Sequence, residues 1–278
     1  MTVVLSHSPP DLSFTPRKPA FEISETLATD WHGGSAFRTA WFNALSCMFP
    51  IGEKFFIDSV RHFRSEVDDP RLLAEVTAFQ GQESVHRMEH QRYNETLCAA
   101  RGYDLDLIEK RLRDRLDWVR ERFSARRQLA GTVAYEHLTA VMAHELLTNP
   151  AVTAGADEEI IRLWRWHAVE ETEHKSVAFD VYTAVGGTAR ERRMAMFMNT
   201  WYFFKDAFGI VRVMLKADGK LWSAREWLSG LNFLFGKPGF LRRCFIPYCR
   251  FYRSAFHPWD HDNRAVIEAW KSNQPHTS

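Results

Sequence analysis

The chain has 278 residues, of which 45% are hydrophobic and 26% are charged, as in ordinary globular proteins, so wholesale disorder is excluded. Its 36 Lys and Arg residues nearly balance its 35 Asp and Glu residues, and a net charge of +1 argues against a nucleic-acid partner or a membrane role driven by overall charge. Four scattered cysteines are too few for a disulfide framework, which indicates a reduced, cytoplasmic protein. No stretch of about 18 uncharged apolar residues occurs, and the apolar N-terminus is too short for a signal peptide.

The N-terminal part of the chain has the composition of an extended arm, and helical patterns begin after it. Residues 1–30 carry several prolines among polar residues and lack an apolar period. We predict a first helix over residues 35–47, an interruption at Pro50 and a resumed helix over residues 51–65. The interruption is expected because proline lacks the backbone N–H that a helix interior uses.

The following helices have clear start and stop signals. Asp69 followed by Pro70 opens a long helix, and residues 104–127 form the next one. The pattern turns apolar over residues 129–147, and a last long helix is expected over residues 157–185, before a Gly-Gly pair. Long helices with short links predict an all-α fold, a ferritin-like four-helix bundle with additional C-terminal helices.

The C-terminal third differs in composition from the rest of the chain. Residues 190–256 contain 16 aromatic side chains and 13 basic against four acidic ones, a local charge of +9. Two or three helices are expected there, and core packing explains any single aromatic residue. The combination of charge and aromatic content also favours an acidic amphiphile or peripheral contact with an anionic membrane, whereas no nucleic-acid motif accompanies it. We therefore divide the chain into an arm (1–30), a metal-binding bundle (31–188) and a C-terminal extension (189–278).

Two short motifs of the form Glu-x-x-His carry the chemistry. They are Glu83 with His86 and Glu171 with His174, and each lies inside a predicted long helix. Because three helical residues turn about 300°, the two side chains of each pair project from one face as neighbours. A single pair is also explained by a surface hydrogen bond. Two pairs on separate helices predict the ligands of a dinuclear carboxylate site.

Such a site needs one further glutamate from each of two other helices. Glu53 and Glu136 lie in apolar surroundings on the helices before each pair, so the ligands follow one another in the order of an antiparallel bundle. Four buried carboxylates would repel one another, and two divalent metals cancel their charge. His167 shares a helix face with the second pair and is a seventh candidate, although a core histidine bonded to a carbonyl is the alternative.

Neighbouring histidines and acids are assigned supporting roles. We interpret three histidines as structural or as partners of the ligands: His90, His137 and His144. We expect four glutamates to face solvent or basic side chains: Glu89, Glu145, Glu170 and Glu173. Oxygen-rich donors with a few imidazoles favour iron, with manganese next, and zinc is not excluded by affinity. The predicted cofactor is therefore a pair of metal ions.

The sequence resembles a bacterial family of predicted metal-dependent hydrolases. Five segments carry the resemblance: residues 49–53, 80–86, 136–139, 166–180 and 257–260. The resemblance spans nearly the whole chain, and residues 166–180 are its most specific part. It implies a ferritin-like fold and metal dependence, and its hydrolase label is a name given by prediction.

The ligand order is also similar to that of di-iron N-oxygenases, which oxidise aryl amines to nitro compounds. Those enzymes likewise use four glutamates and three histidines. The resemblance implies seven ligands here: Glu53, Glu83, His86, Glu136, His167, Glu171 and His174. It is confined to these ligands, so their substrate is not carried over.

We weigh three functions for such a centre. The leading interpretation is a di-iron oxidase or oxygenase that activates O₂ and oxidises a small apolar or amphiphilic substrate. It would need a separate electron donor or reductase, because no flavin or nicotinamide motif is present. The alternatives are a hydrolase that uses metal-activated water, and a non-catalytic metal-binding protein. The oligomeric state is left open.

Overall fold

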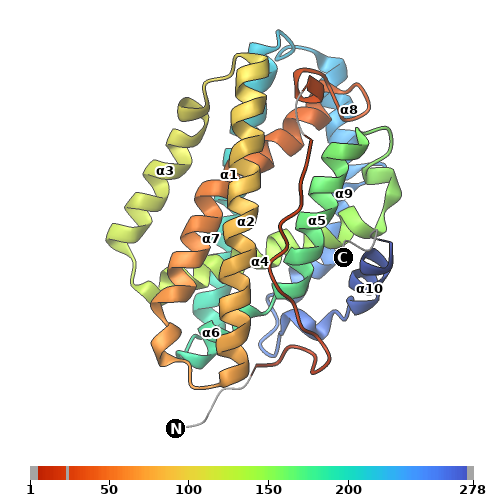
Figure 1. Cartoon of the computed structure of the whole chain (residues 1–278). Coiled ribbons are helices and arrows are strands. Elements are labelled where there is room, and N and C mark those ends of the chain that lie inside the picture. The colour runs from red at the N-terminus through yellow and green to blue at the C-terminus, as the bar shows by residue number, and fades with distance from the viewer. Residues whose placement is uncertain (1–5, 23–24, 274–278) are drawn as a thin grey trace.

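Helices account for the regular secondary structure of this computed structural model, which describes residues 6–22 and 25–273 (Figure 1). Within those residues no strand forms, and a single β-bridge pairs His32 with Ala156. The prediction of an all-α helical bundle with additional C-terminal helices is confirmed.

Four helices form the bundle that contains the candidate site: α1 (Ala36–His62), α2 (Pro70–Arg101), α4 (Ala125–Thr148) and α5 (Glu158–His174). Helix α1 packs mainly on α2, and α4 mainly on α5, while contacts of α1 with α4 and of α2 with α5 close the bundle. Each helix begins at a side-chain cap, as the sequence predicted for α2, where Asp69 accepts a hydrogen bond from the N–H of Arg71.

Helix α1 runs unbroken through Pro50, so the predicted interruption is wrong. A proline at this position leaves the carbonyl of Ser46, four residues earlier, without its helical donor. The side-chain amide of Asn94 on α2 donates to that carbonyl at 3.0 Å. The neighbouring helix therefore satisfies the group that proline leaves unpaired.

The helix predicted over residues 157–185 is also wrong, because it ends at His174 and resumes as α6 (Val177–Ala184). The two residues of the break bind the C-terminal part of the chain. Lys175 donates to the carbonyl of His261 and the side chain of Asn263, and Ser176 accepts from the indole of Trp259. Polar contacts with distant residues set this break, in the absence of glycine or proline.

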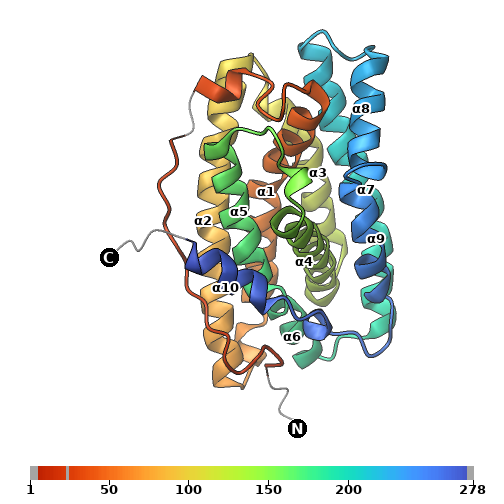
Figure 2. The same cartoon turned by 90° about the vertical axis from the view of Figure 1, so that its right-hand side faces the viewer.

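The remaining helices are α3 (Leu105–Arg122), α7 (Ala189–Ala217), α8 (Ala224–Phe235), α9 (Phe240–Arg250) and α10 (Arg264–Ser272). Four of them cover the α1 and α4 side of the bundle, and α10 lies on the α5 side (Figure 2). Helices α7 and α9 pack against α4, and α8 against α1, while α10 lies against α5. Three helices thus lie within residues 190–256, as expected. The division at residues 30 and 188 stays a prediction.

The N-terminal arm runs in extended form along α2 and α5 (Figure 1). It packs closely at Gly81 of α2, where a Cβ atom would clash with the ring of Pro16. The next residue, Arg17, turns its guanidinium inward toward Glu170 and Glu173 of α5. The arm therefore brings a cation to the helix that carries three of the predicted ligands.

Candidate metal centre

All seven predicted ligands lie together in the interior of the bundle, and none is more than 4% exposed. Helix α1 supplies Glu53 and α4 supplies Glu136. The remaining five come from α2 and α5: Glu83, His86, His167, Glu171 and His174. The side chains that the helical spacing placed on shared faces of α2 and α5 therefore meet those of α1 and α4 in the bundle interior.

Glu171 lies at the middle of the cluster. Its Oε1 atom is 3.0 Å from Nε2 of His167 and 3.5 Å from Nε2 of His174. The same oxygen is 3.6 Å from Nδ1 of His86. On the far side, Nε2 of His174 is 3.1 Å from Glu83 and 3.5 Å from Glu136.

The ligand atoms fall into two groups of three, each with all its atoms within 4.8 Å of one another. One group joins Glu53, His86 and His167, and the other joins Glu83, Glu171 and His174. Glu136 lies against the second group through His174. Glu171 belongs to the second group, and its Oε1 atom also lies 3.0 Å from Nε2 of His167 in the first, so the two groups adjoin at this carboxylate.

Many of these buried atoms make no hydrogen bond within the described residues. Both carboxylate oxygens of Glu53, Glu83 and Glu136 are in this state. So are Nδ1 of His86 and Nε2 of His174, the nitrogens that face the centre. An unpaired buried polar atom costs roughly 1–3 kcal/mol, and more if charged. The donor set therefore fits bound cations, which would satisfy all these atoms at once.

The opposite ring nitrogens are fixed by the surrounding helices. Nε2 of His86 is 3.0 Å from Glu170, and Nδ1 of His174 is 3.0 Å from the amide oxygen of Gln82. Nδ1 of His167 is 2.7 Å from Nε2 of His90, and Nδ1 of His90 is bonded to Ser46. Such contacts orient a metal-binding imidazole and select its tautomer.

Glu170 and Glu173 complete a buried layer behind the ligands. Arg17 donates to Glu170 at 2.9 Å and to Glu173 at 2.6 Å, and Lys271 of α10 lies 3.3 Å from Glu173. Glu170 also accepts from the indole of Trp166. These glutamates were expected to face either solvent or basic side chains, and the structure places them against basic side chains. Nothing in the sequence pointed to Arg17, since an extended arm has no period that reveals its contacts.

The other supporting residues lie outside this layer. Glu89 pairs with Arg92 and Glu145 with Arg243. His137 is bonded to the carbonyl of Pro247, a structural contact. His144 packs against the ring of His261, with centroids 4.5 Å apart.

Burial and mutual repulsion dominate the electrostatics of the centre. Burial, with the charges of neighbouring glutamates, holds the pKa values of Glu53 and Glu136 well above their usual range. Burial also raises the pKa of Glu83. Although burial alone would raise it, the imidazoles of His167 and His174 hold the pKa of Glu171 well below its usual range. Four carboxylates cannot all ionise here without added positive charge, which divalent cations would supply.

Apolar side chains wall the centre, with space for little more than water. Two cavities of about 40 Å³ each flank it, one reaching Glu53 and the other reaching His167 and Glu171. Leu45 and Phe49 line both cavities. A volume of this size holds about one water molecule.

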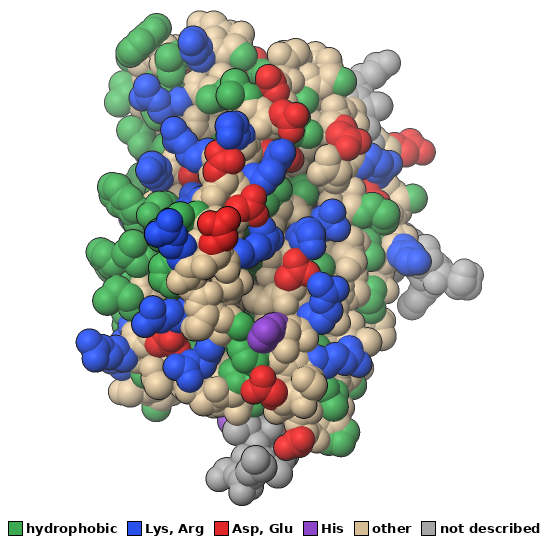
Figure 3. Space-filling view, turned by 90° about the vertical axis from the view of Figure 1, so that its left-hand side faces the viewer, with side chains coloured by type: hydrophobic (Ala, Val, Ile, Leu, Met, Phe, Trp, Pro, Cys, Tyr) green, Lys and Arg blue, Asp and Glu red, His purple; other side chains and the backbone are tan. Residues whose placement is uncertain are grey.

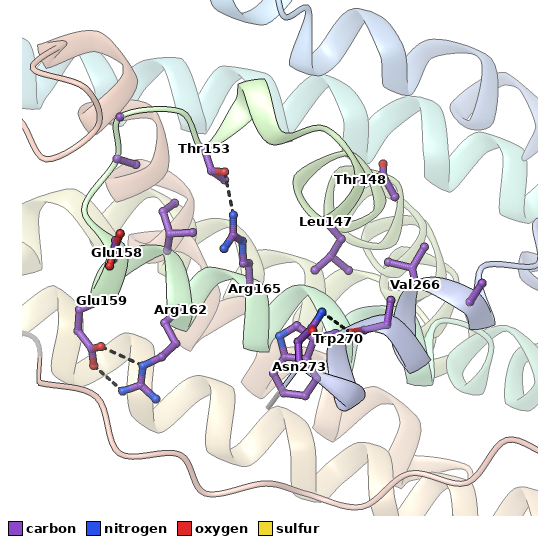
Figure 4. Close-up of a pocket in the computed structure, with 15 residues that line it drawn as sticks. Leu147, Thr148, Thr153, Glu158, Glu159, Arg162, Arg165, Val266, Trp270 and Asn273 are labelled. Atoms are coloured by element: carbon purple, nitrogen blue, oxygen red, sulfur yellow. Dashed lines mark hydrogen bonds and ion pairs between the residues drawn. The ribbon is translucent and has the colours of Figure 1, made fainter. Parts of the chain in front are cut away.

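A groove of about 1020 Å³ lies between α5 and α10 (Figure 4). Figure 4 shows Glu159 paired with Arg162, and Arg165 directed at Thr153. None of the seven ligands lines it. Arg162 and Arg165, which line this groove, project from α5 on the side roughly opposite to His167.

A second histidine and carboxylate cluster joins the arm to the C-terminal segment. His7, Asp180 and His257 place their ligand atoms within 4.8 Å of one another. No sequence pattern predicts this cluster, because its three members are far apart in the chain and only Asp180 lies in a helix.

Comparison with known families decides the affiliation. A family model described as predicted metal-dependent hydrolase matches residues 15–262. The chain belongs to this family. No curated protein and no solved structure matches the chain. The family that the five segments indicated is thus confirmed. The similarity to ferritin-like proteins stays a prediction.

Membership of this hydrolase family corrects the leading functional interpretation. The sequence favoured a di-iron oxidase or oxygenase, and the match supports the hydrolase alternative instead. The error has a physical reason, since buried carboxylates and imidazoles hold divalent metals without regard to the reaction that follows. The separate electron donor was expected only for an oxidase, so that expectation no longer has a basis.

None of the helices in the described chain combines the length and apolar character needed to cross a bilayer. The cytoplasmic location stays a prediction. The absence of a nucleic-acid partner also stays a prediction.

Proposed function

We propose that this protein is a hydrolase that uses two divalent metal ions held by the seven buried ligands. The observation that carries the proposal is the set of unpartnered carboxylate and imidazole atoms that converge from α1, α2, α4 and α5. Membership of the predicted metal-dependent hydrolase family supports the reaction class.

The two groups of ligand atoms define what each side chain would hold. Glu53, His86 and His167 would bind one ion, and Glu83 and His174 the other. Glu171 would contribute its carboxylate to the second ion, and Glu136, 3.5 Å from Nε2 of His174, would complete that group. In such a site bound metals polarise a carbonyl or phosphoryl oxygen and lower the pKa of water.

The protein itself supplies orientation and exclusion of bulk water. Glu170, Gln82 and His90 hold the three imidazoles from behind, so their metal-facing nitrogens are positioned before any ion binds. Leu45 and Phe49 place apolar side chains beside the centre and line the two small cavities that reach Glu53 and Glu171.

The metal is the sharpest test of the reaction class. Zinc has no redox chemistry, whereas it supports hydrolysis. We expect the chelated protein, reloaded with Zn²⁺ or Mn²⁺ under argon, to hydrolyse members of a panel of p-nitrophenyl esters, p-nitrophenyl phosphate and p-nitroanilides. Chelation and the Glu171→Gln variant should each abolish turnover.

The matched control is Asp180→Asn, which removes a buried carboxylate outside the centre. This variant should keep its hydrolytic activity. Turnover that survives both chelation and Glu171→Gln would contradict the proposal. So would an activity that appears only with iron, a reductant and O₂.

A further inference from the structure

A second groove, of about 620 Å³, lies between α3, α4 and α7. Ala130, Gly131 and Tyr135 of α4 form its floor, and Trp118 and Met198 lie on its two walls. The absence of a side chain at Gly131 leaves the floor open, since a Cβ there would meet only the flexible amide of Asn199 at 3.6 Å. Its volume is that of sites which hold small organic ligands.

The groove leads toward the proposed metal centre. Phe55, Leu116 and Tyr135 line the groove and also line the small cavity that reaches Glu53. These three side chains, from α1, α3 and α4, lie at the boundary that the two spaces share. A chain-like molecule that displaced them would arrive at Glu53.

The charge of the groove is positive. Four arginines line it (Arg115, Arg126, Arg127 and Arg190), against one acid, Glu191. Arg126 and Arg127 share Glu191 as their partner, and Arg115 pairs with the buried Asp206. Within the described chain Arg190 forms no ion pair, so positive charge is left over at the end where α4 and α7 begin.

We propose that this groove binds the substrate, an unbranched apolar chain with an anionic group at one end and the hydrolysable bond at the other. The anion contacts Arg126 and Arg190, the chain lies over Gly131, and the opposite end passes Tyr135 to reach Glu53. This inference rests on the proposed hydrolase function for the reaction at that end, while binding in the groove does not require metal.

Binding of simple amphiphiles tests the groove apart from catalysis. Dodecanoate, dodecanol and dodecyltrimethylammonium would be titrated calorimetrically, below their critical micelle concentrations, into wild type and into the Glu53→Gln variant. We expect dodecanoate to bind both proteins, and to bind about tenfold or more tightly than the other two, because a charge-assisted contact is worth roughly 1.5–3 kcal/mol.

Variants then locate the binding. Gly131→Leu fills the floor and should weaken dodecanoate at least tenfold, while Gly209→Leu, at a helical glycine outside the groove with similar open space, should not. Arg190→Ala should weaken dodecanoate but leave dodecanol unchanged. Equal binding to Gly131→Leu and wild type would overturn the groove, and equal binding of the cationic amphiphile would overturn the anion specificity. If dodecanoate binds in the groove but the metal-loaded protein hydrolyses no substrate, the proposed hydrolase function is contradicted and the groove is not.

A different observation concerns the outer face of α7, α8 and α9. Most large hydrophobic side chains that are exposed lie here, including Phe197, Trp201, Leu228, Phe245 and Ile246 at 64–70% exposure. Figure 3 shows hydrophobic side chains gathered along the edge at its left, with Lys and Arg side chains beside them. On α7 the exposed Phe197 and Trp201 lie one helical turn apart on this face, beside Met194 and Met198, which line the groove.

We infer that this face docks on an anionic membrane surface. The +9 charge of residues 190–256 complements anionic headgroups, and exposed aromatic residues insert at that depth. A second copy of the chain fits less well, because a two-fold interface would set the same basic patch against itself.

Vesicle flotation tests this face. Wild type should float with vesicles of phosphatidylcholine and phosphatidylglycerol, and at least tenfold less with phosphatidylcholine alone, since each basic residue near the surface contributes about 1 kcal/mol. Trp201→Ser combined with Phe245→Ser should remove flotation. Met88→Ser and Leu107→Ser, on exposed hydrophobic residues of α2 and α3, are matched controls that should not. Equal flotation on both vesicles would overturn the inference, as would a dimer, seen by light scattering, that the double variant dissociates.

Discussion

Two clusters of histidine and carboxylate lie in this molecule, and they differ in how their polar atoms are satisfied. In the cluster of His7, Asp180 and His257, nearly every acceptor has a donor. Nε2 of His257 is 3.0 Å from Asp180, and its Nδ1 accepts from the N–H of Trp259. The other oxygen of Asp180 accepts from the backbone of His7. In the buried centre, eight carboxylate and imidazole atoms make no hydrogen bond within the described residues.

The difference separates a structural contact from a candidate metal site. The outer cluster ties the arm to α6 and to the segment around Pro258, and its groups are already paired. The centre has acceptors that face one another with no donor, an arrangement that needs cations. Both clusters bring histidines and carboxylates close together, so closeness alone does not identify a metal site. Buried polar atoms without a hydrogen-bond partner are the better criterion.

The largest expected effect is on metal content. Glu171→Gln removes the central carboxylate and should abolish binding of at least one ion per chain, with activity falling more than about a hundredfold, beyond the loss typical of supporting residues. Asp180→Asn should leave metal content at the wild-type value. Metal analysis by mass spectrometry of proteins purified side by side measures both. Equal loss in the two variants would erase the distinction between the clusters.

A smaller effect is expected behind the ligands. Glu170→Gln keeps the shape of the side chain but weakens the acceptor that orients His86. Metal affinity should fall about 10–100-fold, measured by competition with a chromophoric chelator. Glu89→Gln is the control, because Glu89 also lies on α2 but forms its ion pair with Arg92. Unchanged affinity in Glu170→Gln would show that His86 needs no such partner.

The arm should contribute through Arg17. Arg17→Met leaves two buried carboxylates without their strongest cation, although Lys271 and Trp166 still contact them. We expect the free energy of unfolding to fall by about 2 kcal/mol, since a buried ion loses its partner. Urea denaturation measures this fall. Arg61→Met breaks an exposed pair with Asp58 and should cost less than about 1 kcal/mol.

The sequence was sufficient to predict that the candidate ligands lie close together, because helical geometry is local. Residues three or four apart share a helix face whatever the tertiary structure, so the two Glu-x-x-His pairs and His167 could be placed together before any fold was known. The order of Glu53 and Glu136 then followed from an antiparallel bundle.

What the sequence did not reveal depends on contacts between distant residues. Helix α1 continues through Pro50 because Asn94 of another helix replaces the missing donor. The break after His174 depends on Asn263 and Trp259, and the role of Arg17 depends on residues more than 150 positions away. The reaction class was equally out of reach, because the same ligands serve oxidation and hydrolysis.

The smallest expected effect is a change in stability with pH that depends on His32. This residue tests whether unpaired buried atoms alone identify a metal site. Its two ring nitrogens make no hydrogen bond within the described residues, as in the centre, but it joins no group of three ligand side chains. Burial, with the charge of Arg38, lowers its pKa to about 4. The unfolded chain therefore binds this proton below about pH 6.5 while the folded chain does so only below about pH 4, and stability is lost as the pH falls between these values.

Phenylalanine should replace His32 without this penalty, because the ring stacks on Phe42 with centroids 4.9 Å apart. Between pH 7.5 and pH 5, wild type should lose about 2 kcal/mol more stability than His32→Phe, as measured by urea denaturation at both values. Metal content should be unchanged, because an unpaired imidazole without carboxylates does not hold an ion. A loss of metal in His32→Phe would mean that unpaired nitrogens alone suffice, and the distinction drawn between the two clusters would then fail.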